Sequence, residues 1–303
     1  MARLRLALLA AALTAGAAVP ARAADPTVLV AASTDGSLVR VTLTGRTATT
    51  EVLVQGSDAG YYAPTQARGD AVSFAFLVEA PRGTRYEVGL LDARTGAARL
   101  LTRDGRSGFL LVSPDGRFRY VMRTDADGYP VSLVRTDGAG RNERTLVAKP
   151  RTQVAQLSGA GITADGRTIY LARTTPTAPS VLFGVDTVTG ATRVVRPSVP
   201  MKAIHNVVVS PDGRMLAVSY MDDARGLHVA TVDVATGQAN ELTTYGAQTA
   251  SAFTTDGTAV VLTAPFLGTG LPAEPGLALG DVASGVVTPI LGTADLYQAV
   301  PVA

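Results

Sequence analysis

The chain has 303 residues, of which 47% are hydrophobic, and it contains no cysteine and only two histidines. Without cysteine it can form neither a disulfide nor a cysteine nucleophile, and two histidines cannot build a three-histidine zinc site. A chain of this length can bury a sizeable core in one domain, because all-β domains often reach this size.

The N-terminus has the pattern of a secretory signal peptide. Arg3 and Arg5 precede an apolar run over residues 6–19, and Ala21-Arg22-Ala23 follows. The run is shorter than the roughly 20 apolar residues of a spanning helix, so we expect cleavage before Ala24 and no membrane insertion. The expected organisation is a signal peptide over residues 1–23 and one secreted, extracytoplasmic domain over residues 24–303.

Cleavage would also remove the excess of positive charge. Residues 1–23 hold three arginines and no acid, so Lys and Arg fall from 27 to 24 against 25 Asp and Glu. A nearly neutral mature chain does not favour binding to nucleic acid or to a membrane surface.

Glycine-marked turns recur along the rest of the chain at the period of a propeller blade. A small residue followed by glycine ends a β-like run six times, at Gly45, Gly96, Gly138, Gly190, Gly237 and Gly285. The spacings of 51, 42, 52, 47 and 48 residues fit a four-stranded blade. We therefore predict an all-β, six-bladed β-propeller with four-stranded antiparallel blades.

A second motif marks the turn between the innermost strand of each blade and the next strand. VSPDGR stands at residues 112–117 and again at 209–214, with weaker copies at 162–167 and 253–258 and a degenerate one at 68–70. There are five such turns, one fewer than the six small-residue-plus-glycine turns. The first blade therefore lacks its innermost strand. Residues 296–302 can supply that innermost strand, which would close the ring and protect its sheet edges.

The segment RLLTRDGRSGFLLVSPDGRFRYVMRTDADGYPVSLVRTDGAGRNERTL, residues 99–146, resembles the WD-repeat-like TolB propeller repeat, in which RxLT, SPDG and a DxxG turn recur in this order. The resemblance implies a six-bladed propeller that binds a protein or a small ligand. Two features depart from the family. No Trp precedes SPDG, and the repeats follow the signal peptide directly, without the α/β domain that precedes the propeller in TolB.

The repeated aspartate is predicted to be a turn residue. Ser-Pro-Asp-Gly is the residue order of a type I turn followed by a left-handed glycine, and Ser and Asp can hydrogen-bond the backbone of such a turn. Asp115 and Asp212 are therefore interpreted as structural. They lie on the face opposite the longer, dissimilar loops, where binding usually resides.

A ring of candidate binding residues is expected at the channel mouth on the variable-loop face. Alignment of the innermost strands on their turns gives Tyr62, Gly108, Ser158, His205 and Thr249, completed by Tyr297 or Gln298. Most of these are polar, which indicates either a small ligand pocket or a water-filled funnel. The predicted ligand-binding residues are Tyr62, Ser158, His205, Asn206, Thr249 and Tyr297.

Evidence for catalysis in the sequence is thin. The acidic loops with Asp125 and Asp127 and with Asp222 and Asp223 could bind calcium, but no EF-type ligand set is in register, and solvated acids also account for them. No G-x-S-x-G elbow occurs, and we predict neither a cofactor nor a metal ligand. The expected function is a monomeric, non-catalytic binding module for an envelope or extracellular protein or a small ligand. The alternative is a calcium-dependent hydrolase or lactonase that uses the loop face.

Overall fold

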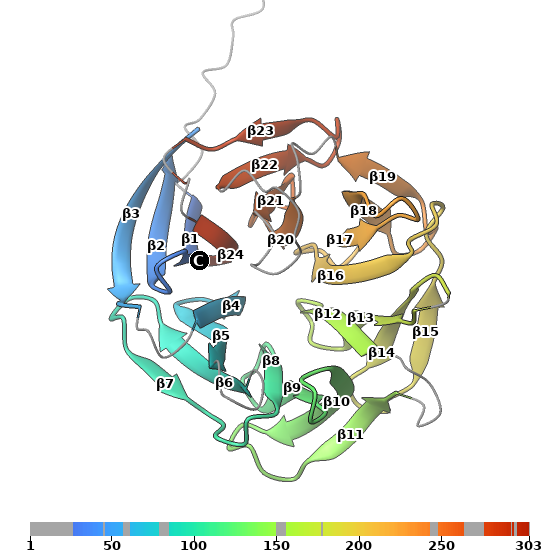
Figure 1. Ribbon diagram of the computed structural model, residues 1–303, viewed down its shortest axis with the longest axis horizontal. Coiled ribbons are helices and arrows are strands. Elements are labelled where there is room, and N and C mark those ends of the chain that lie inside the picture. Colours follow the sequence, from blue (N-terminus) through green and yellow to red (C-terminus); the bar gives the residue numbers. More distant parts are fainter. Residues whose placement is uncertain are drawn as a thin grey trace, which may run out of the picture.

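The computed structural model is a ring of six four-stranded antiparallel sheets around a central axis (Figure 1). It describes residues 27–44, 46–56, 61–78, 85–149, 156–176, 178–242, 248–263, 276–291, 293 and 296–302. The predicted six-bladed propeller is confirmed. The described ranges contain no helix that is long and apolar enough to cross a membrane.

Each blade runs outward from the axis in chain order, except that blade 1 takes its innermost strand from the end of the chain. Blade 1 contains β24 (Leu296–Val302), β1 (Thr27–Ser33), β2 (Leu38–Thr44) and β3 (Thr47–Val54). Blade 2 contains β4 (Tyr61–Arg68), β5 (Ala71–Val78), β6 (Arg85–Asp92) and β7 (Ala98–Leu100). Blade 3 contains β8 (Ser107–Val112), β9 (Phe118–Thr124), β10 (Pro130–Asp137) and β11 (Arg144–Ala148). Blade 4 contains β12 (Gln156–Ile162), β13 (Thr168–Thr174), β14 (Val181–Asp186) and β15 (Thr192–Val195). Blade 5 contains β16 (Ala203–Val209), β17 (Met215–Met221), β18 (Leu227–Asp233) and β19 (Ala239–Leu242). Blade 6 contains β20 (Thr249–Phe253), β21 (Ala259–Thr263), β22 (Leu277–Asp281) and β23 (Val287–Pro289).

The ring closes by pairing the last strand with the first. β24 runs antiparallel to β1, with Val28 opposite Val302 and Val30 opposite Val300. This is the predicted closure, and the bounds of β24 are those expected from the sequence. Because the first and last strands share one sheet, blade 1 holds the two ends of the ring together.

The hydrophobic core lies between neighbouring blades. Leu29 and Val41 of blade 1, for example, pack in one cluster with Val261 and Leu277 of blade 6. The middle strands are buried on both faces, and β17 shows five consecutive buried residues. Such strands appear in the sequence as continuous apolar runs, because a blade on each side covers both faces.

The SPDG motif forms the predicted turn. The Ser113 hydroxyl donates to Oδ1 of Asp115 at 2.6 Å, and the same oxygen accepts from the Arg117 amide at 3.0 Å. Gly116 has φ 71°, in the left-handed region that glycine adopts without strain. The carboxylate of Asp212 makes the same two bonds, with Ser210 and Arg214. These aspartates therefore stabilise the turns at one end of the innermost strands.

Every innermost strand contains a β-bulge. One residue on the inner strand has no partner on the next strand, so two residues there oppose one across the pair. The unpaired residues, from blade 1 to blade 6, are Gln298, Thr65, Gly108, Gly159, His205 and Ser251. The bulges bend the strands around the axis and set which side chains line the channel.

Candidate functional site: the axial cavity

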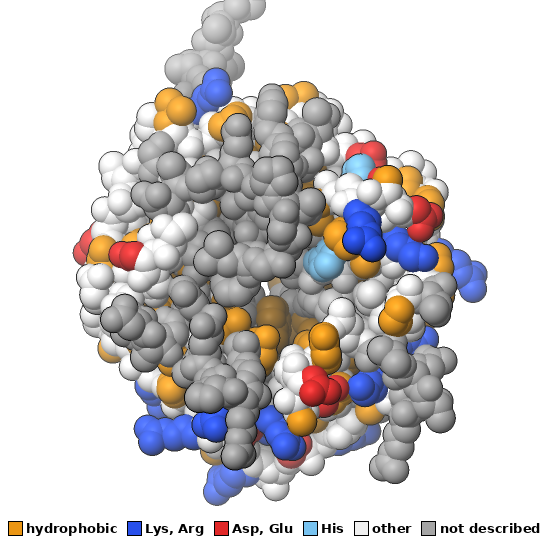
Figure 2. Space-filling model, in the orientation of Figure 1, with side chains coloured by type: hydrophobic (Ala, Val, Ile, Leu, Met, Phe, Trp, Pro, Cys, Tyr) orange, Lys and Arg blue, Asp and Glu red, His pale blue; other side chains and the backbone are white. Residues whose placement is uncertain are grey.

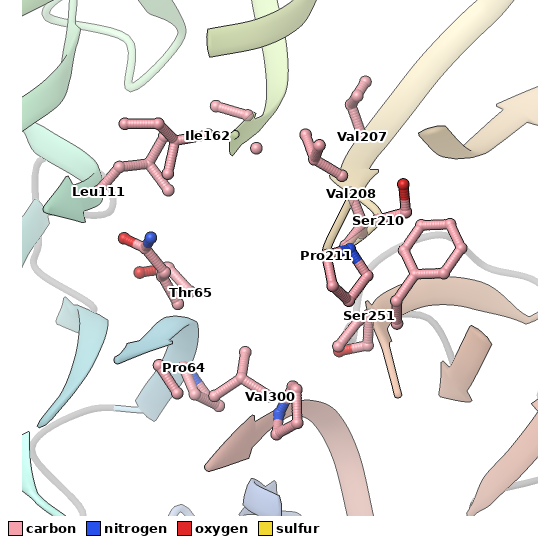
Figure 3. Close-up of a pocket in the computed structure, with 18 of the residues that line it drawn as sticks. Pro64, Thr65, Leu111, Ile162, Val207, Val208, Ser210, Pro211, Ser251 and Val300 are labelled. Atoms are coloured by element: carbon pink, nitrogen blue, oxygen red, sulfur yellow. The ribbon is translucent and has the colours of Figure 1, made fainter. Parts of the chain in front are cut away.

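A cavity of about 400 Å³ lies on the propeller axis, and all six innermost strands line it. Figure 3 shows Thr65, Leu111 and Ile162 across the space from Val208, Pro211 and Ser251. Its wall extends from the bulges to the motif turns, where Pro114 and Pro211 border it. The space-filling view of Figure 2 shows apolar side chains in the central hollow and charged ones mostly toward the periphery.

The wall of the cavity is uncharged. None of the described residues that line it is Asp, Glu, Lys, Arg or His. Apolar side chains such as Leu111, Ile162, Val207 and Val300 make up much of the surface. A charged ligand would lose its hydration here without gaining an opposite charge, at a cost of several kcal/mol. The cavity is therefore suited to an uncharged ligand.

Three polar side chains of the wall, those of Thr65, Asn206 and Ser251, donate hydrogen bonds to the backbone of the next blade. The Thr65 hydroxyl donates to the Leu110 carbonyl oxygen at 2.8 Å, and the Ser251 hydroxyl donates to that of Ala299 at 2.6 Å. The Asn206 side chain likewise joins blade 5 to blade 6, because its Nδ2 donates to the carbonyl oxygen of Ala250 in β20 at 2.7 Å. These bonds link neighbouring blades and fix the side chains before any ligand binds.

The two glutamines of the wall are less constrained. Oε1 of Gln66 accepts from the Val112 amide at 2.8 Å, which leaves its Nε2 free among the described residues. The side-chain amide of Gln298 has no hydrogen-bond partner among the described residues, and Gln298 is one of the residues that line the cavity. Gln298 also has φ 49°, which is uncommon for a residue other than glycine.

Of the six residues predicted to bind a ligand, only Asn206 lines the described cavity. Tyr62 instead packs against Phe74 and Phe76, with ring centroids 5.3 and 4.8 Å apart. The Ser158 hydroxyl donates to the Ile204 carbonyl oxygen in the next blade at 2.5 Å.

The other three predicted residues, His205, Thr249 and Tyr297, lie toward the end of the innermost strands that is away from the motif turns. The His205 side chain is exposed at its bulge, and partial desolvation lowers the pKa of its imidazole. The hydroxyls of Thr249 and Thr263 lie 3.4 Å apart across β20 and β21. The Tyr297 side chain lies outside the described parts of the chain, as do several loops of that face, so a ligand role for this end stays a prediction.

Sequence reasoning missed Thr65, Gln66 and Ser251, and named Gln298 only as an alternative to Tyr297. The alignment counted back from the motif turns, but the bulges fall at different distances from those turns. The predicted positions therefore coincide with the bulge residues at Gly108 and His205, whereas in β12 the predicted residue was Ser158 and the bulge residue is Gly159. The signal available in the sequence was a polar residue that interrupts an apolar strand just before its turn.

The predicted acidic loops bind the chain's only two lysines. Nζ of Lys149 lies 3.3 Å from Oδ2 of Asp125, and Nζ of Lys202 lies 3.7 Å from Oδ1 of Asp223. Oδ1 of Asp125 also accepts from the amides of Asp127 and Tyr129. Among the described residues, no group of three or more His, Cys, Asp or Glu is arranged to hold a metal ion.

Asp222 belongs to a small polar cluster on blade 5. Its Oδ2 lies 3.1 Å from Nε2 of His228, and its Oδ1 accepts from the Gly226 amide at 2.7 Å. The His228 ring stacks on Tyr220, whose hydroxyl donates to Glu241. Burial and this neighbouring carboxylate raise the pKa of the Tyr220 phenol, which therefore stays protonated.

Comparison with solved structures identifies the fold. The structure is similar to TolB from Acinetobacter baumannii, with a TM-score of 0.67 and 16% sequence identity, over 92% of this chain and 67% of that one. The chain has a TolB-like propeller fold. The sequence itself matches no protein-family model and no curated protein.

Two further solved structures with the same fold belong to different kinds of protein. A chain of a nidogen/laminin complex matches with a TM-score of 0.65 and 11% identity, over 92% of this chain and 99% of that one. An oligogalacturonate lyase in complex with manganese matches with a TM-score of 0.54 and 14% identity, over 82% of this chain and 75% of that one. The TolB-like fold is therefore shared by a member of a protein complex and by an enzyme.

Proposed function

We propose that this protein is an exported, non-catalytic binding module whose axial cavity receives an uncharged, partly apolar peptide segment of an envelope or extracellular protein. The observation that carries the proposal is the uncharged wall of a cavity of about 400 Å³, within the usual range for ligand pockets. The likeness to TolB and to a chain of a nidogen/laminin complex supports a binding role.

The depth of the cavity suits a short stretch of extended chain. From the bulge at His205 to the motif turn, β16 continues through residues 206–209. Four extended residues span roughly 13 Å at about 3.3 Å each. A peptide of three or four residues could therefore reach from the motif turns to the level of the bulges, with apolar side chains against Leu111, Ile162 and Val208.

The proposal is tested with tetrapeptides made of Ala, Val, Pro and Ser, acetylated at one end and amidated at the other, and titrated by calorimetry or NMR. The controls are peptides of equal length with a central Asp or Lys. We expect the uncharged peptides to bind at least tenfold more tightly. A preference for the charged peptides, or no binding by any of them, would overturn the proposal.

A pair of variants locates the binding. Val208→Trp places a large ring in the cavity and should abolish peptide binding. Val194→Trp adds the same ring on the outer strand β15, where Val194 is 51% exposed, and should leave binding unchanged. Equal loss in both variants, or no loss in Val208→Trp, would place the bound peptide elsewhere.

Export is part of the proposal and has its own test. The signal-peptide pattern of residues 1–23 predicts that the mature chain begins at Ala24. N-terminal sequencing of protein from the extracytoplasmic fraction should give Ala24 as the first residue. An unprocessed chain that stays in the cytoplasm would contradict export without affecting the peptide-binding proposal.

The alternative, a metal-dependent hydrolase or lactonase, has the likeness to a manganese-bound lyase in its favour. The acids that would hold the metal nevertheless have other partners here, because Asp125 and Asp223 are paired with Lys149 and Lys202. We therefore favour the binding module over the enzyme.

A further inference from the structure

Gln298 has a positive φ, which among the described residues is otherwise found mainly at glycine, with Asn142 and Arg225 as the other exceptions. It is the unpaired residue of the bulge in β24, with φ 49°. The equivalent residue in the bulge of β12 is Gly159, with φ 47°. Glycine adopts this conformation freely, whereas a residue with a Cβ is strained in it. Strained residues persist where the surrounding structure or a function requires their side chains.

The packing around the bulge does not explain the glutamine. Thr65 and Ser251, at the corresponding positions, use their hydroxyls to bind the next blade. The side-chain amide of Gln298 makes no such bond within the described chain, and Gln298 is among the residues that line the cavity. Gln298 therefore adds a side-chain donor and acceptor without partners in the described chain to the residues that line the cavity, at a conformational cost.

A second amide lies on the neighbouring innermost strand. β24 of blade 1 and β4 of blade 2 adjoin each other at the axis (Figure 1). Gln66 of β4 is held by the Val112 amide through its Oε1, so its Nε2 is the part left to donate. The wall thus offers one complete carboxamide and one further N–H donor, without any charge.

We propose that Gln298, assisted by Gln66, recognises a peptide group of the ligand in the axial cavity. A primary amide can donate to the carbonyl oxygen of a peptide group and accept from its N–H, and the Gln66 Nε2 supplies a further donor to carbonyl oxygen. This assignment rests on the proposed function and adds to it that the ligand's backbone, rather than only its apolar side chains, is recognised.

Three variants of Gln298 separate strain from recognition, with the best-binding uncharged tetrapeptide as the probe. Gln298→Gly should raise Tm by about 2–4 °C, because it relieves the strain, and should weaken binding about tenfold. Gln298→Met keeps the length and the strained backbone, so binding should weaken equally with Tm nearly unchanged. Gln298→Asn, which tolerates positive φ and keeps an amide, should retain more affinity than Gln298→Met.

A change in the ligand checks that the lost contact is the peptide group. Replacing one peptide N–H at a time by an ester oxygen should weaken binding to the unmodified protein at one position and have no effect there in Gln298→Met. If all three variants bind the peptide as the unmodified protein does, while Val208→Trp abolishes binding, the cavity function stands and the role of Gln298 is wrong. If the unmodified protein binds no peptide, both proposals are wrong.

Discussion

The buried hydroxyl of Ser219 accepts a hydrogen bond from the backbone amide of Ala250 at 2.8 Å, and so joins a middle strand of blade 5 to the innermost strand of blade 6. Both residues are fully buried. Blades of this ring are therefore connected by polar contacts within the core as well as by the apolar clusters between them.

Ser219→Ala should destabilise the protein by about 1–3 kcal/mol, because it leaves the Ala250 amide buried without an acceptor. Equilibrium urea denaturation measures the loss. Ser132→Ala, in a half-buried position on β10, is the matched control and should change stability by less. Equal stability of the two variants would show that another group satisfies the Ala250 amide.

Protonation of the turn aspartates should destabilise the protein in acid. The hydrogen bond from the Ser210 hydroxyl, and then that from the Arg214 amide, lower the pKa of Asp212 below its ordinary value of 3.8, and Asp115, Asp165 and Asp256 are lowered in the same way. A carboxyl whose pKa is lower in the folded state stabilises the fold above its unfolded pKa and loses that contribution as the pH falls through the folded one.

We therefore expect the contribution of the turn aspartates to stability to stay nearly constant from pH 7 to about pH 5 and to decline below the ordinary aspartate value of 3.8. Denaturation at a series of pH values tests this. Asp212→Asn should be less stable at neutral pH and should show a shallower acid decline. An unchanged slope in that variant would mean that other carboxylates cause the decline.

Calcium should not stabilise the protein through the acidic loops. Asp125 already binds two backbone amides and Lys149, so an ion would have to displace the lysine. Thermal melting in calcium and in chelator should give the same Tm. A rise of several degrees in calcium would favour the metal-dependent hydrolase, and its disappearance in Asp125→Asn would assign the ion to that loop.

Removal of β24 should open the ring. Deleting residues 296–302 exposes an edge of β1 and uncovers Leu29 and Val30, which are fully buried in the closed ring. Exposed edges pair with other chains, so the shortened protein should aggregate in size-exclusion chromatography. Addition of a peptide with the sequence of residues 296–302 should suppress this aggregation. A soluble, folded deletion variant would show that the closure is dispensable.

The blades could be predicted from the sequence because each carries its own local signals. Turn glycines such as Gly116 and Gly213 and the apolar runs of the middle strands repeat at a regular period. The cavity could not be predicted equally well, because it depends on where each innermost strand bulges. A bulge changes which residues face the axis. At Gly159 it goes with a close approach to the backbone of Val207 in the next blade, a contact that the sequence of a single strand does not reveal.

The two lysines have a practical consequence for surface attachment. Lys149 follows β11 and Lys202 precedes β16, so both lie at the end of the ring away from the motif turns. Apart from the terminal amine, coupling reagents for primary amines can react only at these two sites on the chain. Coupling to a sensor chip through these two lysines would hold the propeller by that end and leave the motif-turn end of the axial cavity accessible to a peptide in solution.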